Sequence, residues 1–419
     1  MRILAFYPYL PWPLNRGAYH RAYHLLKALA QKHTVDLLAL SENAEGIGFE
    51  RNFTDFCDRV YVRPFRHPEW ERLFPRRLLN PLPSTVAHWT IPSLSAELSR
   101  LLSSRHYDAV HVLDLVLAQY LFAEHRGLAV VLDRTRVDLQ YQLMEHQRLN
   151  FSLRNRFLNF ENYAKLWFFE KQVARRCALQ VLCGPDDESF VRKYISQSVP
   201  LAIIPNGVDL DFFHCDSSTE TRASEPTIIF CGAMDYNPNV DALRWYFSEI
   251  HDQLARQIQN LRVLIVGKDP VPEVKSYADL TGVTVTGGVP DVRPYYKRAW
   301  LQIVPLRIGG GTRLKIAESL GIGTPVVSTP IGAQGLDLRH EHDILYADTA
   351  SEFAAQAARA LHDVALRNRL EQNGRDSAEK RLSWKTLGAN LCRAYDTHLH
   401  PNRAPSAAQS IPAAEPVLR

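Results

Sequence analysis

The sequence has no long apolar run and few cysteines, and these two absences narrow the class of protein. No stretch of about 18 apolar residues occurs that could span a bilayer, so we expect any membrane contact to be peripheral. The start of the chain lacks the cleavage pattern of a signal peptide. No cysteine pair has CxxC spacing and no histidine cluster accompanies a cysteine, which predicts reduced thiols of a cytosolic protein and no zinc site. The cysteines are Cys57, Cys177, Cys183, Cys215, Cys231 and Cys392.

The chain also lacks a strong charge of either sign. Its 49 Lys and Arg against 45 Asp and Glu give a net charge of +4. Such mild basicity suits an anionic partner, and a nucleotide diphosphate, a phospholipid surface or a nucleic acid all fit it. Nucleic acid is the least favoured of these, because no base-reading module is present. With 419 residues and 46% hydrophobic content, we expect two globular domains.

Short apolar runs alternate with helical patterns, and this alternation begins twice. Strands separated by helices predict parallel sheets covered on both faces, so the fold class is α/β with two Rossmann-like, doubly wound domains. In such sheets ligands bind beyond the carboxyl ends of the strands. The first set of expected strands is 2–6, 35–40, 59–62, 109–113 and 129–132, and the second set is 227–231, 262–266, 283–286, 301–304 and 325–328.

We place the domain boundary between residues 176 and 177. Residues 1–176 form the N-terminal domain and 177–384 the C-terminal domain, with a helix at about 385–399 that packs back on the first domain. Residues 400–419 are rich in Pro, Ala and Ser, and we expect a disordered tail.

Residues 305–329 contain a strand end, a glycine loop and a helix start. Glycines 309–311 let backbone amides approach an anion, and Thr312 is a candidate N-cap. Arg313 and Lys315 lie in the first turn, where the helix dipole disfavours cations, and a bound phosphate would explain their position. Glu318 can accept hydrogen bonds from ribose hydroxyls. A solvated surface turn is the alternative interpretation of a glycine triplet alone.

This stretch, PLRIGGGTRLKIAESLGIGTPVVST, resembles the donor-binding segment of family 4 retaining glycosyltransferases, which have the GT-B architecture of two domains facing across a cleft. Glu318 falls on the second glutamate of the family motif, and Gly310 replaces the first. The resemblance implies a nucleotide-sugar donor, UDP- or GDP-linked, and no cofactor. The donor-binding residues implied by the motif and its context are Gly17, Val289, Arg307, Gly310, Gly311, Thr312, Arg313, Lys315 and Glu318.

Further segments extend the resemblance to about residues 1–399. PNGVD at 205–209 and GAMDYNPNVDA at 232–242 resemble the start of the family's donor domain, although Ala233 stands where many members have a phosphate-binding Arg. Arg307, Arg313 or Lys315 would supply that charge instead. TGGVPDVRPYY at 286–296 resembles the base-recognition loop, with backbone groups near Val289 reading the base. A helix capped by Asp291 is an alternative or coexisting interpretation.

The N-terminal domain offers further candidates. The resemblance places a glycine loop at 11–18, with Gly17 near the donor phosphates, and Arg16 and Arg21 nearby. Many relatives have H-x-H at the end of the fourth strand, with the second His close to the sugar, but here His111 is followed, two residues on, by Leu113, so the second His is not matched. The catalytic candidates are Asp114, at the strand end where ligands bind, and His111, for which a buried structural role is the alternative.

Two segments combine aromatic and basic residues, 65–89 and 151–176. Both suit an anionic lipid surface or a lipid-linked acceptor. The alternative is a core helix with snorkelling basic side chains.

The motif set most resembles sugar transferases of bacterial exopolysaccharide clusters, including exosortase-associated ones. It implies a retaining transferase that moves a sugar to a glycan or lipid-linked acceptor, in the cytoplasm or on the inner face of the cell membrane. No DxD motif is placed so as to hold a metal on the diphosphate, so we expect metal independence. A GT-B nucleotide-sugar epimerase and a non-catalytic nucleotide-sugar-binding subunit are the alternatives, the latter suggested by Gly310 and Leu113.

Overall fold

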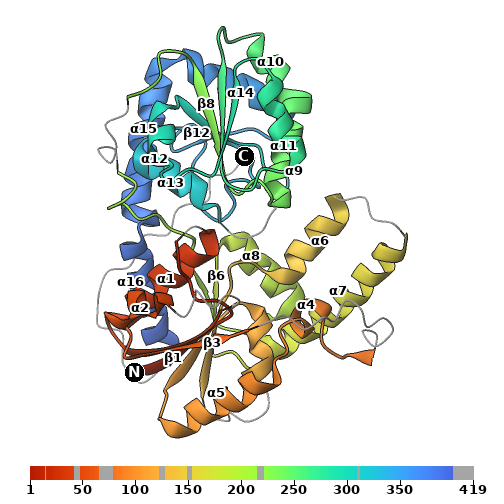
Figure 1. Cartoon of the computed structure of the whole chain (residues 1–419), viewed down its shortest axis with the longest axis vertical. Coiled ribbons are helices and arrows are strands. Elements are labelled where there is room, and N and C mark those ends of the chain that lie inside the picture. Colours follow the sequence, from red (N-terminus) through yellow and green to blue (C-terminus); the bar gives the residue numbers. More distant parts are fainter. Residues whose placement is uncertain are drawn as a thin grey trace.

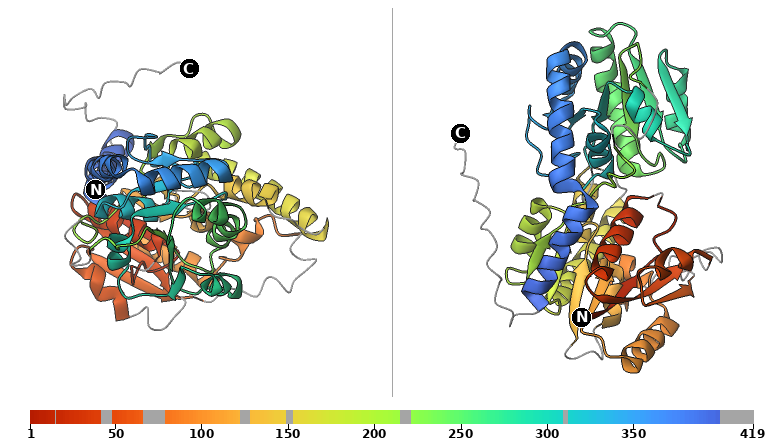
Figure 2. Two further views of the ribbon diagram at one scale, coloured as in Figure 1. Left: turned by 90° about the horizontal axis from the view of Figure 1, so that it is seen from above. Right: turned by 90° about the vertical axis from the view of Figure 1, so that its left-hand side faces the viewer.

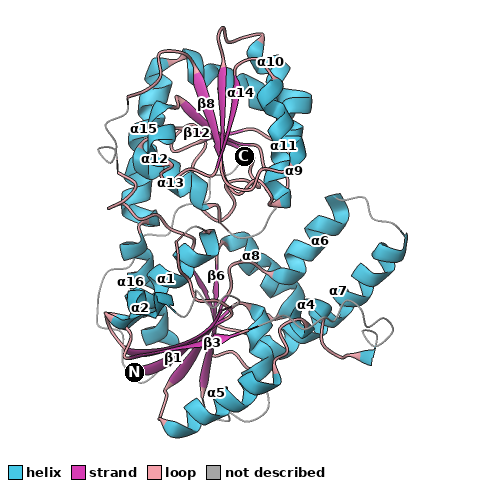
Figure 3. Ribbon diagram, in the orientation of Figure 1, coloured by secondary structure: helices cyan, strands magenta, loops and turns pink. Residues whose placement is uncertain are grey.

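The computed structural model describes residues 1–14, 16–41, 48–65, 79–121, 128–148, 153–214, 221–308 and 312–399. Two α/β domains are stacked along the long axis of the molecule, with the N-terminal domain at the bottom of Figure 1. Each domain has a sheet flanked by helices (Figure 3). Among the described residues, no helix has both the length and the apolar character needed to cross a bilayer.

The N-terminal sheet is parallel throughout. Over the described ranges it has seven strands in the order β3-β2-β1-β4-β5-β6-β7. Its central strands are buried on both faces, because helices pack on both sides of the middle of the sheet. The strands are β1 (Arg2–Tyr7), β2 (Thr34–Ser41), β3 (Arg59–Pro64), β4 (Ala109–Leu113), β5 (Ala129–Asp133), β6 (Leu179–Leu182) and β7 (Leu201–Ile203).

Two helical layers cover this sheet. Ile3 and Ala5 of β1 pack in the cluster formed with α1, α2 and α16, whereas Leu4 and Phe6 pack in the cluster formed with α5 and α7. Successive side chains of a strand point to opposite faces of the sheet, so alternate residues of β1 belong to the same cluster. The helices are α1 (Gly17–Ala30), α2 (Arg51–Thr54), α4 (Ser84–Ala87), α5 (Pro92–Ser104), η3 (Leu115–Leu121), α6 (Asp138–Arg148), α7 (Leu153–Ala174), α8 (Pro185–Phe190) and η4 (Val191–Ile195).

The C-terminal sheet is also parallel. In the described part of the chain it has six strands in the order β10-β9-β8-β11-β12-β13, namely β8 (Thr227–Cys231), β9 (Arg262–Val266), β10 (Val283–Gly287), β11 (Leu301–Val304), β12 (Val326–Ser328) and β13 (Leu345–Tyr346). The helices are α9 (Asn237–Trp245), η5 (Tyr246–Ile250), α10 (His251–Ala255), α11 (Pro272–Ser276), η6 (Tyr277–Asp279), α12 (Arg293–Arg298), α13 (Leu314–Ile322), α14 (Ala350–His362), α15 (Val364–Ser377) and η7 (Ala378–Leu382).

Sheet membership differs from the expected division at residues 176 and 177. β6 pairs with β5, and β7 pairs with β6, so the N-terminal sheet extends to Ile203. An apolar run predicts a strand but carries no information about which sheet the strand joins. The chain enters the C-terminal domain after β7, where Val208 forms an isolated bridge with Ser383.

The last helix, α16 (Trp384–Leu399), returns to the N-terminal domain and packs on α1. The right view of Figure 2 shows the blue helices running from the upper domain down to the lower one. Gly388 permits this close packing, because a Cβ built on it would lie 2.3 Å from the Ala28 Cβ. Residues 400–419 lie outside the described residues.

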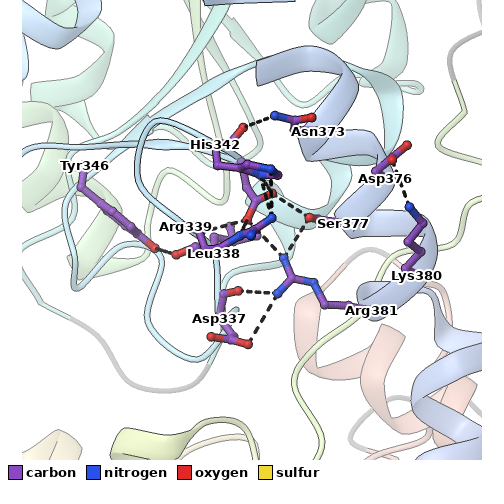
Figure 4. A network of polar contacts seen from close by, with 11 residues as sticks. Asp337, Leu338, Arg339, His342, Tyr346, Asn373, Asp376, Ser377, Lys380 and Arg381 are labelled. Atoms are coloured by element: carbon purple, nitrogen blue, oxygen red, sulfur yellow. Dashed lines mark hydrogen bonds and ion pairs between the residues drawn. The ribbon is translucent and has the colours of Figure 1, made fainter. Parts of the chain in front are cut away.

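A polar network fixes the helices that lead to this crossing. The buried carboxylate of Asp343 accepts hydrogen bonds from the Arg339 backbone N–H at 2.9 Å, from Ser377 Oγ at 2.9 Å and from the Arg381 guanidinium at 3.2 Å. In Figure 4 Arg381 points toward Ser377 and Asp337. Burial opposes ionisation, but these donors hold the pKa of Asp343 below its usual range.

Candidate donor-binding site between the two domains

The start of α13 faces the N-terminal domain. A Cβ built on Gly17, the first residue of α1, would lie 3.1 Å from Leu314 Cδ1, the first residue of α13. Behind these helices, Gly184 after β6 lies against Gly335, and a Cβ on Gly184 would lie 2.6 Å from the Gly335 Cα. The carboxyl edges of the two sheets therefore meet here, and the N-terminal ends of α1 and α13 both carry partial positive charge toward the interface.

Thr312 does not cap α13. The helix begins at Leu314, with Arg313 at the N-cap position in an extended conformation. The Thr312 hydroxyl instead accepts a hydrogen bond from the Asn206 backbone N–H at 2.5 Å, and the Thr312 carbonyl accepts one from Asn206 Nδ2 at 2.8 Å. The tertiary contact therefore replaces the local cap. Gly310 and Gly311 lie outside the described residues.

Arg313 lies in the interface between the domains. Its half-buried side chain interacts electrostatically with Asp187 of α8 and Tyr141 of α6, both in the N-terminal domain, and with Tyr236 of the C-terminal domain. Burial lowers the pKa of the guanidinium, and the nearby Tyr236 and Asp187 oppose that shift. The predicted phosphate-binding arginine is thus surrounded by groups from both domains.

Lys315 reaches the loop that follows β8. Its Nζ donates a hydrogen bond to Asn239 Oδ1 at 2.8 Å and lies 4.2 Å from the centre of the Phe230 ring. Asn239 in turn donates to the Ala233 carbonyl at 2.8 Å. Burial, with a smaller effect from Arg313, lowers the pKa of Lys315 to about 7. Lys315 therefore approaches the position after Gly232 where the family often has its phosphate-binding Arg.

Glu318 lies one turn further along α13 and is half-buried. Burial raises the pKa of its carboxyl to about 7, and the Tyr296 hydroxyl, which donates to Glu318 Oε2 at 3.4 Å, and Lys315 oppose the shift. A carboxylate that retains solvent access in such surroundings is suited to accept hydrogen bonds from hydroxyl groups.

Arg307 has a different environment from Arg313. Its guanidinium forms a two-point ion pair with Asp241, with distances of 2.7 and 3.1 Å, and lies 5.4 Å from the centre of the Trp245 ring. A guanidinium already paired with a carboxylate in this way has fewer donors left for a phosphate. This geometry favours a structural role for Arg307.

The proposed base-recognition loop follows β10. Val289 is partly buried and packs against the core of the C-terminal domain. Gly287 before it has φ +70° with open space around it. α12 begins at Arg293 with Val292 at the N-cap position and no side-chain cap, so the expected cap at Asp291 is wrong. Asp291 Oδ1 instead accepts a hydrogen bond from the Arg293 backbone N–H at 2.9 Å, one residue before the cap position.

Asp114 follows β4 at the edge that faces the interface. It has φ 62°, and its Oδ1 accepts hydrogen bonds from the Thr135 hydroxyl at 2.8 Å and from the Thr135 backbone N–H at 3.2 Å. Burial and the charge of Asp138 raise the pKa of Asp114 to about 6, against these hydrogen bonds. Asp114 is thus a half-buried carboxyl group whose raised pKa lies close to neutral pH, as is common for residues of functional sites.

His111 lies within the sheet and has no exposed surface. Its Nδ1 is 2.7 Å from the Tyr395 hydroxyl of α16, and its Nε2 is 3.7 Å from Asp133 Oδ2. A ring enclosed in this way has no access to a substrate. The structure therefore favours the alternative interpretation of His111, as a buried residue that connects α16 to the sheet.

Sequence reasoning missed several residues of this interface. Arg136 lies after β5 with its guanidinium 4.0 Å from the centre of the Tyr141 ring, and its charge interacts with Asp114 and with Tyr236 of the other domain. Asp187 of α8 faces Arg313. Arg136 and Asp187 both lie shortly after strands of the first sheet, and this position could have marked them as candidates from the sequence. Among the described residues, no group of three or more His, Cys, Asp or Glu side chains could hold a metal ion.

Comparison with known proteins gives one family match and a shared fold. Residues 225–363 match the family model of glycosyl transferases group 1. The match lies within the C-terminal domain, and the two parallel sheets give the whole chain a GT-B-like fold. No curated protein matches the chain in sequence.

Three solved structures illustrate the shared fold. Sucrose-phosphate synthase from Thermosynechococcus elongatus is 17% identical, with 96% of this chain and 100% of that one covered and a TM-score of 0.71. Anabaena Alr3699/HepE in complex with UDP-glucose is 15% identical, with 95% and 100% covered and a TM-score of 0.63. WaaG, a glycosyltransferase involved in lipopolysaccharide biosynthesis, is 14% identical, with 95% and 99% covered and a TM-score of 0.60.

Proposed function

We propose that this enzyme transfers a sugar, with retention of anomeric configuration, from a nucleotide-diphosphate sugar to a glycan or lipid-linked acceptor in exopolysaccharide synthesis. The observation that carries the proposal is the position of residues 312–318. They lie at the carboxyl edge of the C-terminal sheet, where Leu314 touches Gly17 of the other domain. This is where doubly wound sheets bind ligands.

Each donor group has a candidate partner. Arg313, Lys315 and the amides at the start of α13 bind the diphosphate, whose charge the two helix N-termini also stabilise. Glu318 accepts hydrogen bonds from the ribose hydroxyls. Backbone groups at Val289 read the base.

The chemistry follows from these positions. The C1–O bond to the diphosphate breaks, and the acceptor hydroxyl forms a new bond to C1 on the same face of the sugar while its proton passes to the leaving diphosphate oxygen. The nucleoside diphosphate leaves with the bonding electrons, and Arg313 stabilises its negative charge. Asp114 lies at the facing edge and positions the acceptor hydroxyl. No metal enters this scheme.

A UDP-sugar is the first donor to test, because HepE, which shares the fold, was solved with UDP and with UDP-glucose. A thermal-shift screen of UDP-, GDP- and ADP-sugars tests the donor class, followed by calorimetry with Glu318→Gln. We expect one base series to raise the melting temperature of the wild type and the Glu318→Gln variant to bind it more weakly. Absence of any shift across all three series would refute a nucleotide-sugar donor.

Product analysis separates the remaining alternatives. Mass spectrometry of the sugar product distinguishes transfer, which joins the sugar to an acceptor, from epimerisation, which leaves the nucleotide sugar intact. A non-catalytic subunit would bind the donor and release no nucleotide, and Gly310 and Leu113 are the residues that keep this alternative in view.

We place the acceptor at an anionic membrane surface, and α7 carries this part of the proposal. Phe160 and Phe168 on this helix are 69% and 61% exposed, and Tyr194 of the adjacent η4 is also exposed. Lys171 lies 3.7 Å from the centre of the Trp167 ring, so basic and aromatic groups share this region. Exposed aromatic residues beside cations suit the interface of an anionic bilayer. In Figure 1 α6 and α7 project from the side of the N-terminal domain.

The other aromatic segment fits this proposal less well. Phe65 is buried and stacks on Trp89 at 5.0 Å between ring centres, and residues 66–78 lie outside the described residues. Liposome flotation tests the membrane proposal. We expect binding to vesicles with phosphatidylglycerol, weaker binding to neutral vesicles, and loss of binding in a Phe160→Ser/Phe168→Ser double variant. Equal flotation of the wild type and the double variant would contradict it.

A further inference from the structure

A buried chain of hydrogen bonds connects the N-terminal domain to the start of α13. It begins at Arg21 of α1, whose side chain has no exposed surface. The Arg21 guanidinium binds Asp133 Oδ1 of β5, at 2.6 Å from Nη2 and 3.0 Å from Nε. Its remaining nitrogen, Nη1, donates to the Ile204 carbonyl at 2.7 Å and to Asn206 Oδ1 at 3.3 Å. Arg21 therefore holds the segment that joins the two domains.

Asn206 extends the chain to the C-terminal domain. While its side-chain oxygen accepts from Arg21, its backbone N–H and Nδ2 both donate to Thr312, at 2.5 and 2.8 Å. Thr312 directly precedes Arg313. One asparagine thus contacts a cation of the first domain and the residue before the proposed phosphate-binding arginine of the second.

Thr312 is also confined on its other side. A Cβ built on Gly335 would lie 2.5 Å from Thr312 Cγ2, and Gly335 has φ +82°. Glycine at residue 335 therefore leaves the space that the threonine methyl occupies. With Asn206 on one side and Gly335 on the other, Thr312 has little freedom to shift.

We infer that Arg21 and Asn206 are positioning residues for the donor: they form, with Thr312, an interdomain relay that fixes the start of α13 and hence the backbone of Arg313 for diphosphate binding. The inference rests on the proposed donor-binding role of Arg313. A binding group holds its geometry only when the residues behind it are themselves fixed by packing and hydrogen bonds. The relay also explains why Thr312 and Asn206 are buried polar residues at a domain interface, since each satisfies the other's hydrogen-bonding groups.

Thr312→Val tests the relay, because it removes the hydroxyl acceptor and nearly preserves the shape. Thr312→Ser restores the hydroxyl. Thr227→Val is the matched control: Thr227 is 4% exposed against 5% for Thr312, and its hydroxyl also makes one hydrogen bond, to the Glu225 carbonyl, but it lies at the amino end of β8. The two valine variants should lose similar stability.

Two measurements are made on all variants of the full chain. Calorimetry with UDP as the probe should give a Kd about tenfold higher for Thr312→Val, since one lost hydrogen bond corresponds to about this factor, and a near wild-type Kd for Thr312→Ser and Thr227→Val. Hydrogen exchange should be faster in the first turn of α13 in Thr312→Val only.

Arg21→Lys tests the far end of the relay, because lysine keeps a charge beside Asp133 and loses the Nη1 hydrogen bonds to the Ile204 carbonyl and to Asn206 Oδ1. We expect faster exchange at the start of α13, and an Arg21→Lys/Thr312→Val double variant whose effect is smaller than the sum of the two single effects. Should Arg21→Lys fail to fold, Asn206→Ala replaces it in the same cycle.

The outcomes separate the relay from the proposed donor. If the wild type binds no UDP, the UDP donor proposal fails, while exchange at α13 still decides the relay. If exchange and UDP affinity in Thr312→Val match those in Thr227→Val, the relay is overturned and Thr312 is only a packing residue.

Discussion

The pairing of Arg307 and the placement of Arg313 predict that two nearby arginines respond differently to truncation. Arg307 is fastened to Asp241 by a two-point ion pair, whereas Arg313 lies at the domain interface beside the start of α13. We predict that Arg313→Ala weakens binding of a nucleoside diphosphate and that Arg307→Ala mainly lowers stability.

The magnitudes follow from the contacts. A hydrogen bond to a charged group contributes about 1.5–3 kcal/mol, so loss of the Arg313 contact to the diphosphate should raise the Kd for UDP by about 10- to 150-fold. Arg307→Ala leaves Asp241, whose side chain is 10% exposed, without its cation. Because Arg307 itself is 33% exposed, solvent screens the pair, and we expect a stability loss of about 1 kcal/mol.

Calorimetry with UDP at pH 7 and low salt, together with thermal unfolding, measures both effects. Arg244→Ala is the matched control, because Arg244 makes a similar two-point ion pair with Glu273 on the surface of the same domain. We expect this control to leave the Kd for UDP unchanged. Weaker UDP binding in Arg307→Ala than in Arg313→Ala would refute the assignment of the diphosphate to Arg313.

Three further predictions concern charge and packing. Because burial lowers the pKa of Lys315 to about 7, UDP affinity measured by calorimetry should fall as the pH rises from 6 to 8.5. The variant Lys315→Arg should show a flatter dependence of UDP affinity on pH. A wild-type affinity that does not change with pH would exclude a charged Lys315 from the site. Although burial opposes it, Arg21 holds the pKa of Asp133 below its usual range, so this pair stabilises the fold above about pH 4 and less as pH falls further. Asp133→Asn should cost about 3–5 kcal/mol in urea unfolding at pH 7, with a smaller difference from wild type near pH 3, and an equal loss at both pH values would contradict the ion pair. Gly388→Ala should lower the melting temperature by overpacking α16 against α1, whereas Gly48→Ala, with no described residue within 4 Å of its Cβ, should not.

Local sequence patterns predicted the strands well. The runs at 2–6, 109–113 and 227–231 are strands of the structure, because apolar residues in parallel sheets form short continuous runs bounded by turns. The helix that follows the glycines was also found, with α13 beginning at Leu314. These features depend on residues near one another in the chain.

Long-range contacts were not predictable in this way. Pairing of β6 with β5 moved the domain boundary, and the ring of His111 turned out to pair with Tyr395, 284 residues away. Thr312 has the sequence signature of a cap, yet its hydroxyl is taken by Asn206 from 106 residues away. Each outcome depends on which distant residues the fold brings together, and local patterns in a single sequence do not show these contacts.

Sugar transfer by the purified protein is the most direct test of the proposed activity. The purified chain is incubated with the nucleotide sugar that stabilises it and with a lipid-linked acceptor, and nucleotide release and the anomeric configuration of the product are measured together. We predict release of one nucleoside diphosphate for each sugar transferred, with retention of configuration. At a subsaturating donor concentration, Arg313→Ala should lose both nucleotide release and sugar transfer. Donor binding without any nucleotide release across a panel of acceptors, or a product with inverted configuration, would contradict a retaining glycosyltransferase.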